Sequence, residues 1–212
     1  MPAFRRKLRT LRLIALATLA CGTVSRSAFA AAPTYSQDEV EAAFLYRFAG
    51  FVRWPQSALA PSVFTIAVLG DDALADDLAR MLPHQELKGR PAEVRQITSI
   101  DQIGDAQILY IGGSDESTLK RWLARIGGRP VLVVTSQPGA LDDGSTINFL
   151  VIDHHVRFEI SLAAARRSGL SISAELLSVA THIKGGARGS QAPCEMPPRL
   201  RSGPCSPRLA SA

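Results

Sequence analysis

The chain has 212 residues and a formal net charge of +5 at pH 7. The positive charge comes from the two ends. Residues 1–30 hold six basic and no acidic residues, and residues 184–212 hold five basic and one acidic residue, so residues 31–183 keep 13 basic and 18 acidic residues, a net charge of −5. Because a negatively charged domain repels a phosphate backbone, this excludes nucleic-acid binding by the part of the chain expected to fold.

The first 30 residues have the three parts of a cleavable signal peptide. A basic start precedes the apolar run 13–20, and Ala-Phe-Ala at 28–30 predicts cleavage between Ala30 and Ala31. The apolar run is far shorter than the roughly 20 residues that span a bilayer. We therefore predict a protein that is exported to the periplasm and is soluble after cleavage. Lipid attachment at Cys21 is the alternative.

Helices and strands are expected to alternate along the following residues. Ser36 and Glu39 have the spacing of a capping box, which predicts a helix that begins there and stops at Pro55. Another predicted helix has Ser114 as its cap. The predicted strands cover residues 64–70, 91–97, 107–111, 130–135, 146–152 and 156–160, and the further helices cover 71–82, 114–126, 162–168 and 173–183.

The central predicted strands are apolar on both faces, which is typical of a mostly parallel sheet with helices on both sides. We therefore predict a single α/β domain over residues 36–183, built as a three-layer α/β/α sandwich. The last two strands, 146–152 and 156–160, are separated by only three residues and predict an antiparallel hairpin near the C-terminal end of the domain.

The C-terminal residues 184–212 differ from this domain in composition. They contain five prolines and four glycines and no apolar periodicity. Such a segment cannot bury enough apolar surface to offset the entropy lost on ordering, so we predict a disordered tail. Two of the three cysteines of the chain, Cys194 and Cys205, lie in this tail and match no metal-binding spacing.

No pattern typical of a catalytic, cofactor or metal site is present in the sequence. Asp71 and Asp72 follow a predicted strand, but the further Asp and Lys of a phosphoacceptor site are missing, so we interpret them as the cap of a helix. We interpret the glycine pair 112–113 as a turn and the histidine pair 154–155 as the tip of the hairpin. We predict that the protein is not an enzyme and that it holds no cofactor or metal.

The helix that stops at Pro55 carries a candidate protein contact. Arg47, Arg53 and Trp54 lie around its end, and Trp and Arg are enriched where proteins bind one another. The alternative is that Trp54 closes the edge of the core beneath the two arginine side chains.

Several long segments of the sequence resemble the YfiR family. The helical segment 41–55, the strand 64–70 with Gly-Asp-Asp at 70–72, and the segments 156–166 and 169–177 occur in the order of the family's opening and closing signatures. The resemblance extends from about residue 37 to residue 182. The chain lacks the core cysteines that family members often carry near the positions of Ala67 and Ala106, so control through core disulfides is not expected.

The resemblance implies a regulatory role. Proteins of this family are exported α/β regulators without enzymatic activity, and the best-known member restrains an inner-membrane diguanylate cyclase through its periplasmic sensor portion. Release of that restraint raises cyclic di-GMP and favours biofilm, and an outer-membrane lipoprotein can sequester the regulator. The sequence also leaves open whether the protein forms a homodimer.

Two other functions remain open from the residues alone. One is a periplasmic small-ligand binding protein that serves a sensor kinase or another membrane receptor, with its ligand at the carboxyl edge of the sheet near Gly70 and Gly112. The other is an extracytoplasmic hydrolase, which requires a nucleophile and a base within hydrogen-bond reach.

Overall fold

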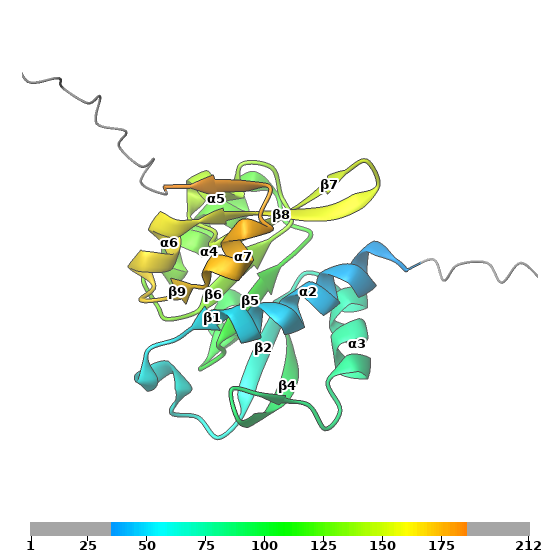
Figure 1. The fold of residues 1–212 in the computed structure, drawn as a ribbon, viewed down its shortest axis with the longest axis vertical. Helices are drawn as coiled ribbons and strands as arrows, with labels where there is room; N and C mark the ends of the chain where they lie inside the picture. Colours follow the sequence, from blue (N-terminus) through cyan, green and yellow to red (C-terminus); the bar gives the residue numbers. More distant parts are fainter. Residues whose placement is uncertain (1–34, 186–212) are drawn as a thin grey trace, which may run out of the picture. The chain divides into compact units, whose positions relative to one another are not determined.

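The computed structural model describes residues 35–185, in which strands and helices alternate along the chain (Figure 1). The strands are β1 (Val52–Arg53), β2 (Phe64–Leu69), β3 (Glu86–Leu87), β4 (Arg90–Ile97), β5 (Ile108–Ile111), β6 (Leu132–Thr135), β7 (Ile147–Ile152), β8 (His155–Ser161), β9 (Ser171–Ile172) and β10 (His182–Lys184). The α-helices are α2 (Gln37–Phe51), α3 (Asp72–Met81), α4 (Glu116–Ile126), α5 (Ala140–Asp143), α6 (Leu162–Arg167) and α7 (Ala174–Ser178). Two 3₁₀ helices cover Gln56–Leu59 and Ile100–Ile103.

Eight of these strands form one sheet in the order β10-β8-β7-β6-β5-β2-β4-β3. The strands from β4 through β2, β5 and β6 to β7 run parallel, whereas β8 is antiparallel to β7, as the predicted hairpin requires. Strand β2 lies between β4 and β5, so the chain reverses its direction of progress across the sheet at β2. A separate antiparallel pair joins β1 to β9.

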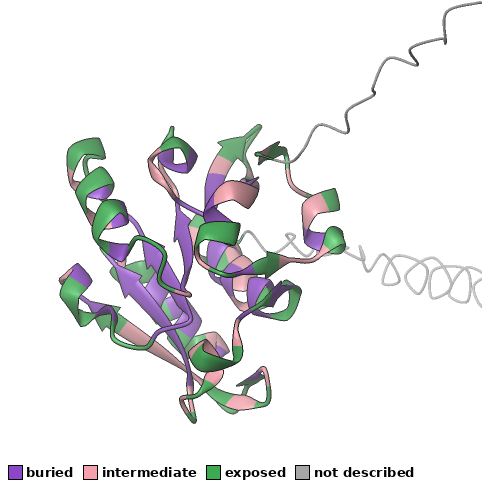
Figure 2. Cartoon of the chain, turned by 90° about the vertical axis from the view of Figure 1, so that its left-hand side faces the viewer, coloured by how far each residue is buried: buried purple, intermediate pink, exposed green. Residues whose placement is uncertain are grey.

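Alternate residues of the central strands point into two different apolar cores. Ile66 and Val68 of β2 belong to a core cluster with buried residues of α2, α3 and α7, whereas Ala67 and Leu69 belong to a second cluster with buried residues of α4 and α5. Figure 2 shows buried residues along the sheet and on the inner sides of the helices. The predicted three-layer α/β/α sandwich is therefore confirmed.

The capping predictions are confirmed at one helix and wrong at another. Ser36 Oγ accepts a hydrogen bond from the Glu39 amide at 3.1 Å, and the Ser36 amide donates to Glu39 Oε2 at 2.8 Å, which completes the predicted capping box of α2. Helix α4 is capped by Asp115 rather than Ser114: Asp115 Oδ1 accepts from the Thr118 amide at 3.0 Å. A carboxylate and a hydroxyl are both good N-caps, so two neighbouring candidates such as Ser114 and Asp115 look alike in the sequence.

The predicted last helix over residues 173–183 is wrong in its second half. Helix α7 ends at Ser178, and residues 182–184 form β10, which pairs in parallel with β8. The Thr181 amide already donates to the Phe158 carbonyl at 2.9 Å, so the free edge of β8 provides hydrogen-bond partners that outcompete a longer helix. The fold thereby extends to Lys184 in β10.

Several predictions fall on residues that the structure does not describe. These are the signal peptide 1–30 with its cleavage between Ala30 and Ala31, the alternative lipid site Cys21, and the tail beyond residue 185. Within residues 35–185, no helix is long and apolar enough to cross a membrane.

Candidate functional site

Helix α2 is fixed to the sheet by a cluster of aromatic rings on its inner side. The ring of Phe48 meets that of Phe158 edge-on, with 5.2 Å between the centroids, and stacks with that of Phe149 at 5.8 Å. Phe44 lies one turn earlier, and its ring centroid is 5.9 Å from that of Phe149 and 5.5 Å from that of Phe158. These rings come from α2, β7 and β8, so they set the orientation of α2 against the hairpin half of the sheet.

A buried polar contact fixes the first half of α2. Glu41 is 1% exposed, and its Oε2 accepts a hydrogen bond from Tyr110 Oη of β5 at 2.8 Å. Tyr110 Oη also lies 3.0 Å from Ser136 Oγ, and Gln37 Nε2 donates to Glu41 Oε1 at 2.8 Å. Each polar atom of the Glu41 side chain therefore has a partner, as burial of a carboxyl group demands.

The environment of this contact shifts the acidity of both groups. Burial raises the pKa of Glu41, the hydrogen bonds from Gln37 and Tyr110 oppose this increase, and the nearby carboxylates of Asp38 and Asp71 add to it. The pKa of Tyr110 is raised as well, first by burial and then by the charge of Glu41. The environment thus favours the protonated form of both side chains, Tyr110 and Glu41.

The carboxyl edge of the sheet beside this contact is closed. A Cβ atom on Gly70 would lie 2.6 Å from the Gly112 carbonyl oxygen, and one on Gly113 would lie 2.8 Å from the Gly70 carbonyl oxygen, so the loops after β2 and β5 touch directly. Asp71 caps α3 through its Oδ1, which accepts from the Leu74 amide at 3.0 Å, and Asp72 lies in the first turn, as predicted. The two loops fill the place where a metabolite was expected.

The histidine pair lies where the sequence suggested. His154 and His155 are exposed at the tip of the β7–β8 hairpin, and Asp153 and His154 both adopt positive φ angles, 50° and 61°. Positive φ at both central residues is the signature of a type I′ turn, which matches the twist of a two-stranded ribbon.

The three predicted partner-binding residues separate in the structure. Trp54 is only 6% exposed: its ring meets Phe64 edge-on at 5.4 Å, and its Nε1 donates to the Gln107 carbonyl at 3.1 Å. Trp54 is therefore a core residue, as the alternative proposed, although the cation over its ring is Lys88, with Nζ 6.0 Å from the ring centroid, rather than an arginine. Arg47 and Arg53 are both exposed.

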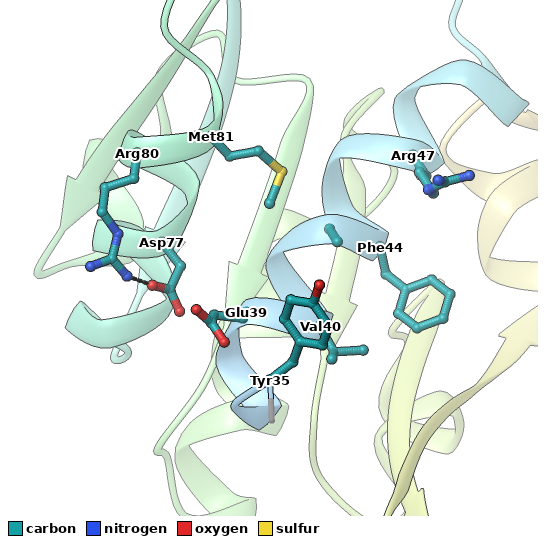
Figure 3. Close-up of a pocket in the computed structure, with 9 residues that line it drawn as sticks. Tyr35, Glu39, Val40, Phe44, Arg47, Asp77, Arg80 and Met81 are labelled. Atoms are coloured by element: carbon teal, nitrogen blue, oxygen red, sulfur yellow. Dashed lines mark ion pairs between the residues drawn. The ribbon is translucent and has the colours of Figure 1, made fainter. Parts of the chain in front are cut away.

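Arg47 lies at one end of a groove along the outer side of α2 (Figure 3). The groove has a volume of ≈ 510 Å³, and apolar side chains from α2 and α3 make up most of its surface. Its lining consists of Tyr35, Glu39, Val40, Ala43, Phe44, Arg47, Asp77, Arg80 and Met81.

Two smaller hollows extend this surface along α2. One of ≈ 280 Å³ shares Tyr35, Val40 and Phe44 with the groove and continues to the β7–β8 hairpin, where Val151 is 56% exposed. The other, of ≈ 230 Å³, shares Arg47 and continues toward Lys88. A continuous exposed surface rich in apolar atoms, with charged groups at its rim, is typical of a protein-binding site.

The groove has opposite charges at its two ends. Glu39 and Asp77 point toward one another at the end formed by the first turn of α2 (Figure 3), and Asp77 also pairs with Arg80. Arg47 marks the other end, close to Lys88. Within residues 35–185, no carboxylate lies within ion-pair distance of Arg47.

Comparison with protein-family models assigns this fold. The model described as YfiR/HmsC-like (DUF4154) matches residues 38–181, which include the buried Glu41–Tyr110 contact and every residue of the outer groove except Tyr35. The chain belongs to the YfiR/HmsC-like family. The resemblance read from the sequence signatures is thereby confirmed.

Solved structures of other proteins are more distant. A conserved domain protein from Vibrio cholerae O1 biovar El Tor is 10% identical, with a TM-score of 0.48 over 70% of this chain and 60% of that chain. An ABC domain from Streptococcus pneumonia, solved in complex with L-Trp, is 12% identical, with a TM-score of 0.45 over 65% of this chain and 61% of that chain. The YfiR/HmsC-like chain thus spans about 60% of the length of these proteins.

Sequence reasoning missed both the buried polar contact and the groove. Glu41 carried a signal: it occupies the same helix side as Leu45 and Phe48, where an acidic residue requires a buried partner. The groove had no such signal, because it depends on how far α3 lies from α2, which only the packing of both helices on the sheet decides.

Proposed function

We propose that this YfiR/HmsC-like protein is exported and binds the periplasmic sensor part of an inner-membrane diguanylate cyclase, lowering cyclic di-GMP synthesis in the cytoplasm. The observation that carries the proposal is the family match over residues 38–181, because the family is regulatory rather than catalytic. The signal-peptide pattern of residues 1–30 supports the periplasmic location.

The buried site supports a regulator rather than an enzyme. Glu41 and Tyr110 have the most chemically suggestive arrangement in the described residues, yet each is only 1% exposed, and neither lines the groove or the two smaller hollows along α2. We interpret this pair as a contact that holds α2 on the sheet.

Repression across a membrane requires a cyclase with two states. A periplasmic protein changes the cytoplasmic output only if it binds the inactive state more tightly than the active one. A coupling free energy of about 1–3 kcal/mol corresponds to an affinity difference of roughly 5–150-fold between the states. We propose the exposed cations Arg47 and Arg53 as protein contacts, and an outer-membrane lipoprotein as a second partner that competes for the regulator.

A small-ligand receptor is the second candidate function. The groove along α2 supports it, and we propose this groove as the ligand site in place of the carboxyl edge of the sheet. Its volume of ≈ 510 Å³ lies within the range of about 300–1,000 Å³ of ligand pockets. In this case the protein serves a sensor kinase or another membrane receptor.

The first experiment measures cyclic di-GMP in the native host. Deletion of the gene is expected to raise the nucleotide level, and the full chain is expected to restore it, whereas a chain without residues 1–30 is not. Unchanged cyclic di-GMP on deletion would overturn the cyclase proposal and direct attention to the receptor function. Restoration by the chain without residues 1–30 would overturn the periplasmic site of action.

A further inference from the structure

The end of the β7–β8 hairpin extends beyond the strands on either side of it. In the described part of the chain, β7 pairs with β6 only at residues 147–148, and β8 pairs with β10 only at residues 159–161. Residues 149–152 and 155–158 pair with each other and form a two-stranded ribbon. Figure 1 shows this ribbon projecting from the body of the domain.

The ribbon carries exposed apolar side chains on both of its faces. Val151 is 56% exposed and Ile152 is 41% exposed. Because the two residues are adjacent on one strand, their side chains point to opposite faces of the ribbon. Val151 is paired across the strands with Val156, and Ile152 with His155. A ribbon in water normally turns polar side chains outward, so an apolar tip on two faces indicates a binding surface.

Tyr35 adds an aromatic ring beside this tip. It is 67% exposed, and it lines the hollow of ≈ 280 Å³ together with Val151 and residues 154–157. Six large apolar side chains within residues 35–185 are exposed, and Tyr35, Val151 and Ile152 are three of them. Half of the exposed large apolar side chains of the described chain thus gather at one projecting point.

The tip also carries nitrogen groups that can bind an anion. Arg157 is exposed and takes part in no ion pair within residues 35–185. His154 is exposed at the turn, and Asp153 is the only acidic residue between positions 149 and 158. The tip therefore combines apolar side chains with donors that suit phosphate oxygens.

We propose that this tip, which consists of Tyr35, Val151, Ile152 and Arg157, binds the surface of a phospholipid membrane. Val151 and Ile152 enter the boundary between headgroups and acyl chains, and the guanidinium group of Arg157 donates hydrogen bonds to headgroup phosphates. Tyr35 has the apolar ring and polar hydroxyl that favour this boundary. A lipid surface surrounds a projecting tip on both faces, whereas a protein that packs flat on the ribbon covers one face.

This membrane contact goes beyond the regulatory function and does not require it. The net charge of −5 on residues 31–183 opposes a general attraction to anionic lipids, so binding depends on the apolar tip. Because two aliphatic side chains and one tyrosine bury little apolar area, the binding is weak and reversible. Such binding raises the local concentration of the protein beside any partner that is embedded in the same membrane.

Co-sedimentation with lipid vesicles tests the contact. The purified, naturally processed protein is mixed with vesicles of equal parts phosphatidylethanolamine and phosphatidylglycerol. The double variant with V151D and I152D is expected to lower the partition coefficient by about tenfold, because charges replace the apolar side chains at the boundary. R157E is expected to lower it by about fivefold, because a carboxylate repels the headgroup phosphates.

Matched controls come from other surfaces of the domain. Val179 lies at the end of α7 and is 65% exposed, so V179D makes the same change at a similarly exposed valine. R121E reverses an exposed arginine of α4. Both controls are expected to bind vesicles within about twofold of wild type, because salt screens charges that lie far from the contact. Unchanged urea midpoints show that all of these variants are folded.

Three results would overturn the proposal. The first is a wild type that stays in the supernatant at every lipid concentration. The second is an equal loss in the hairpin and control variants. The third is binding that survives the double variant, which would assign it to the basic residues 184–212. If the wild type binds no vesicles but V151D abolishes the lowering of cyclic di-GMP, the tip contacts a protein instead.

Fluorescence quenching tests how the tip enters the bilayer. Val151→Trp places an indole ring at the tip, and vesicles with bromine on the acyl chains are expected to quench it. Val179→Trp is the control and is expected to be quenched no more than the wild type, in which Trp54 is buried and Trp122 is partly buried. Equal quenching of the two variants would contradict the proposal. These measurements contain no cyclase, so their failure leaves the cyclic di-GMP result intact.

Discussion

The inner and outer sides of helix α2 satisfy their polar groups in opposite ways. On the inner side, Glu41 is buried and has hydrogen bonds to Tyr110 and Gln37. On the outer side, Arg47 has no ion-pair partner within residues 35–185. The comparison teaches that one helix both packs on the sheet with its inner side and offers a surface with its outer side. Substitutions on the two sides should therefore separate stability from recognition.

The largest expected effect is a loss of stability when a side chain is added at the point where the loops after β2 and β5 touch. Gly70→Ala places a methyl group 2.6 Å from the Gly112 carbonyl oxygen, and Gly70 has a φ of +80°. We expect the free energy of unfolding to fall by more than the roughly 1–3 kcal/mol that a strained backbone conformation costs, measured by urea denaturation.

A matched glycine separates the two causes. Gly139 has a similar φ of +78°, but nothing lies within 4 Å of a Cβ added there. Gly139→Ala therefore measures the backbone contribution alone, and Gly70→Ala is expected to cost more. Equal losses for the two variants would show that the loops after β2 and β5 separate easily, and that the edge is not closed.

An intermediate effect is expected from the buried carboxyl group and depends on pH. Burial raises the pKa of Glu41 in the folded protein above its ordinary value of 4.5, so the folded state binds the proton more tightly than the unfolded chain. The stabilisation that follows is complete below the ordinary value and is lost as the pH rises through the folded-state pKa.

Glu41→Gln removes this dependence. The wild type is expected to lose stability relative to the variant as the pH rises from about 4 to 7, by about 1.4 kcal/mol for each unit by which the pKa is raised. Denaturant unfolding at several pH values measures the difference. A variant whose disadvantage instead grows with pH would mean that the hydrogen bonds from Tyr110 and Gln37 outweigh burial.

The smallest effect on stability is expected on the outer side. Arg47→Ala removes an exposed charge that has no ion-pair partner in the described residues, so the free energy of unfolding of the dilute protein should stay within about 0.5 kcal/mol of wild type. Thermal or urea unfolding checks this. A larger loss would show that Arg47 supports the fold, which would remove the contrast between the two sides of α2.

Local sequence signals predicted much of the fold. The capping box at Ser36 and Glu39 placed the start of α2 correctly, because capping depends on residues three positions apart. The apolar run 64–70 predicted β2, because a strand that is buried on both faces has no polar side and appears in the sequence as a short continuous apolar segment. The prediction of a helix over residues 173–183 was wrong at its end, because residues 182–184 pair with the free edge of β8, which the local sequence does not reveal.

The candidate site divides along the same line. The sequence marked Arg47 and Arg53 as candidate protein contacts near the end of a helix, and the structure leaves both side chains exposed. It also marked Trp54, which the structure buries against Phe64, because the turn after α2 directs the ring inward. A tryptophan beside two arginines looks the same in sequence whether its ring faces solvent or the core.

The sequence by itself determined the family, the layered α/β architecture and the order in which the central strands and helices follow one another along the chain. These follow from hydrophobic periodicity, caps and long signatures within continuous segments. Only the tertiary structure decided that the loops after β2 and β5 close the sheet edge and that a groove opens between α2 and α3. Both features depend on distances between segments that are remote in the chain, and these distances follow from packing on the common sheet rather than from any local pattern.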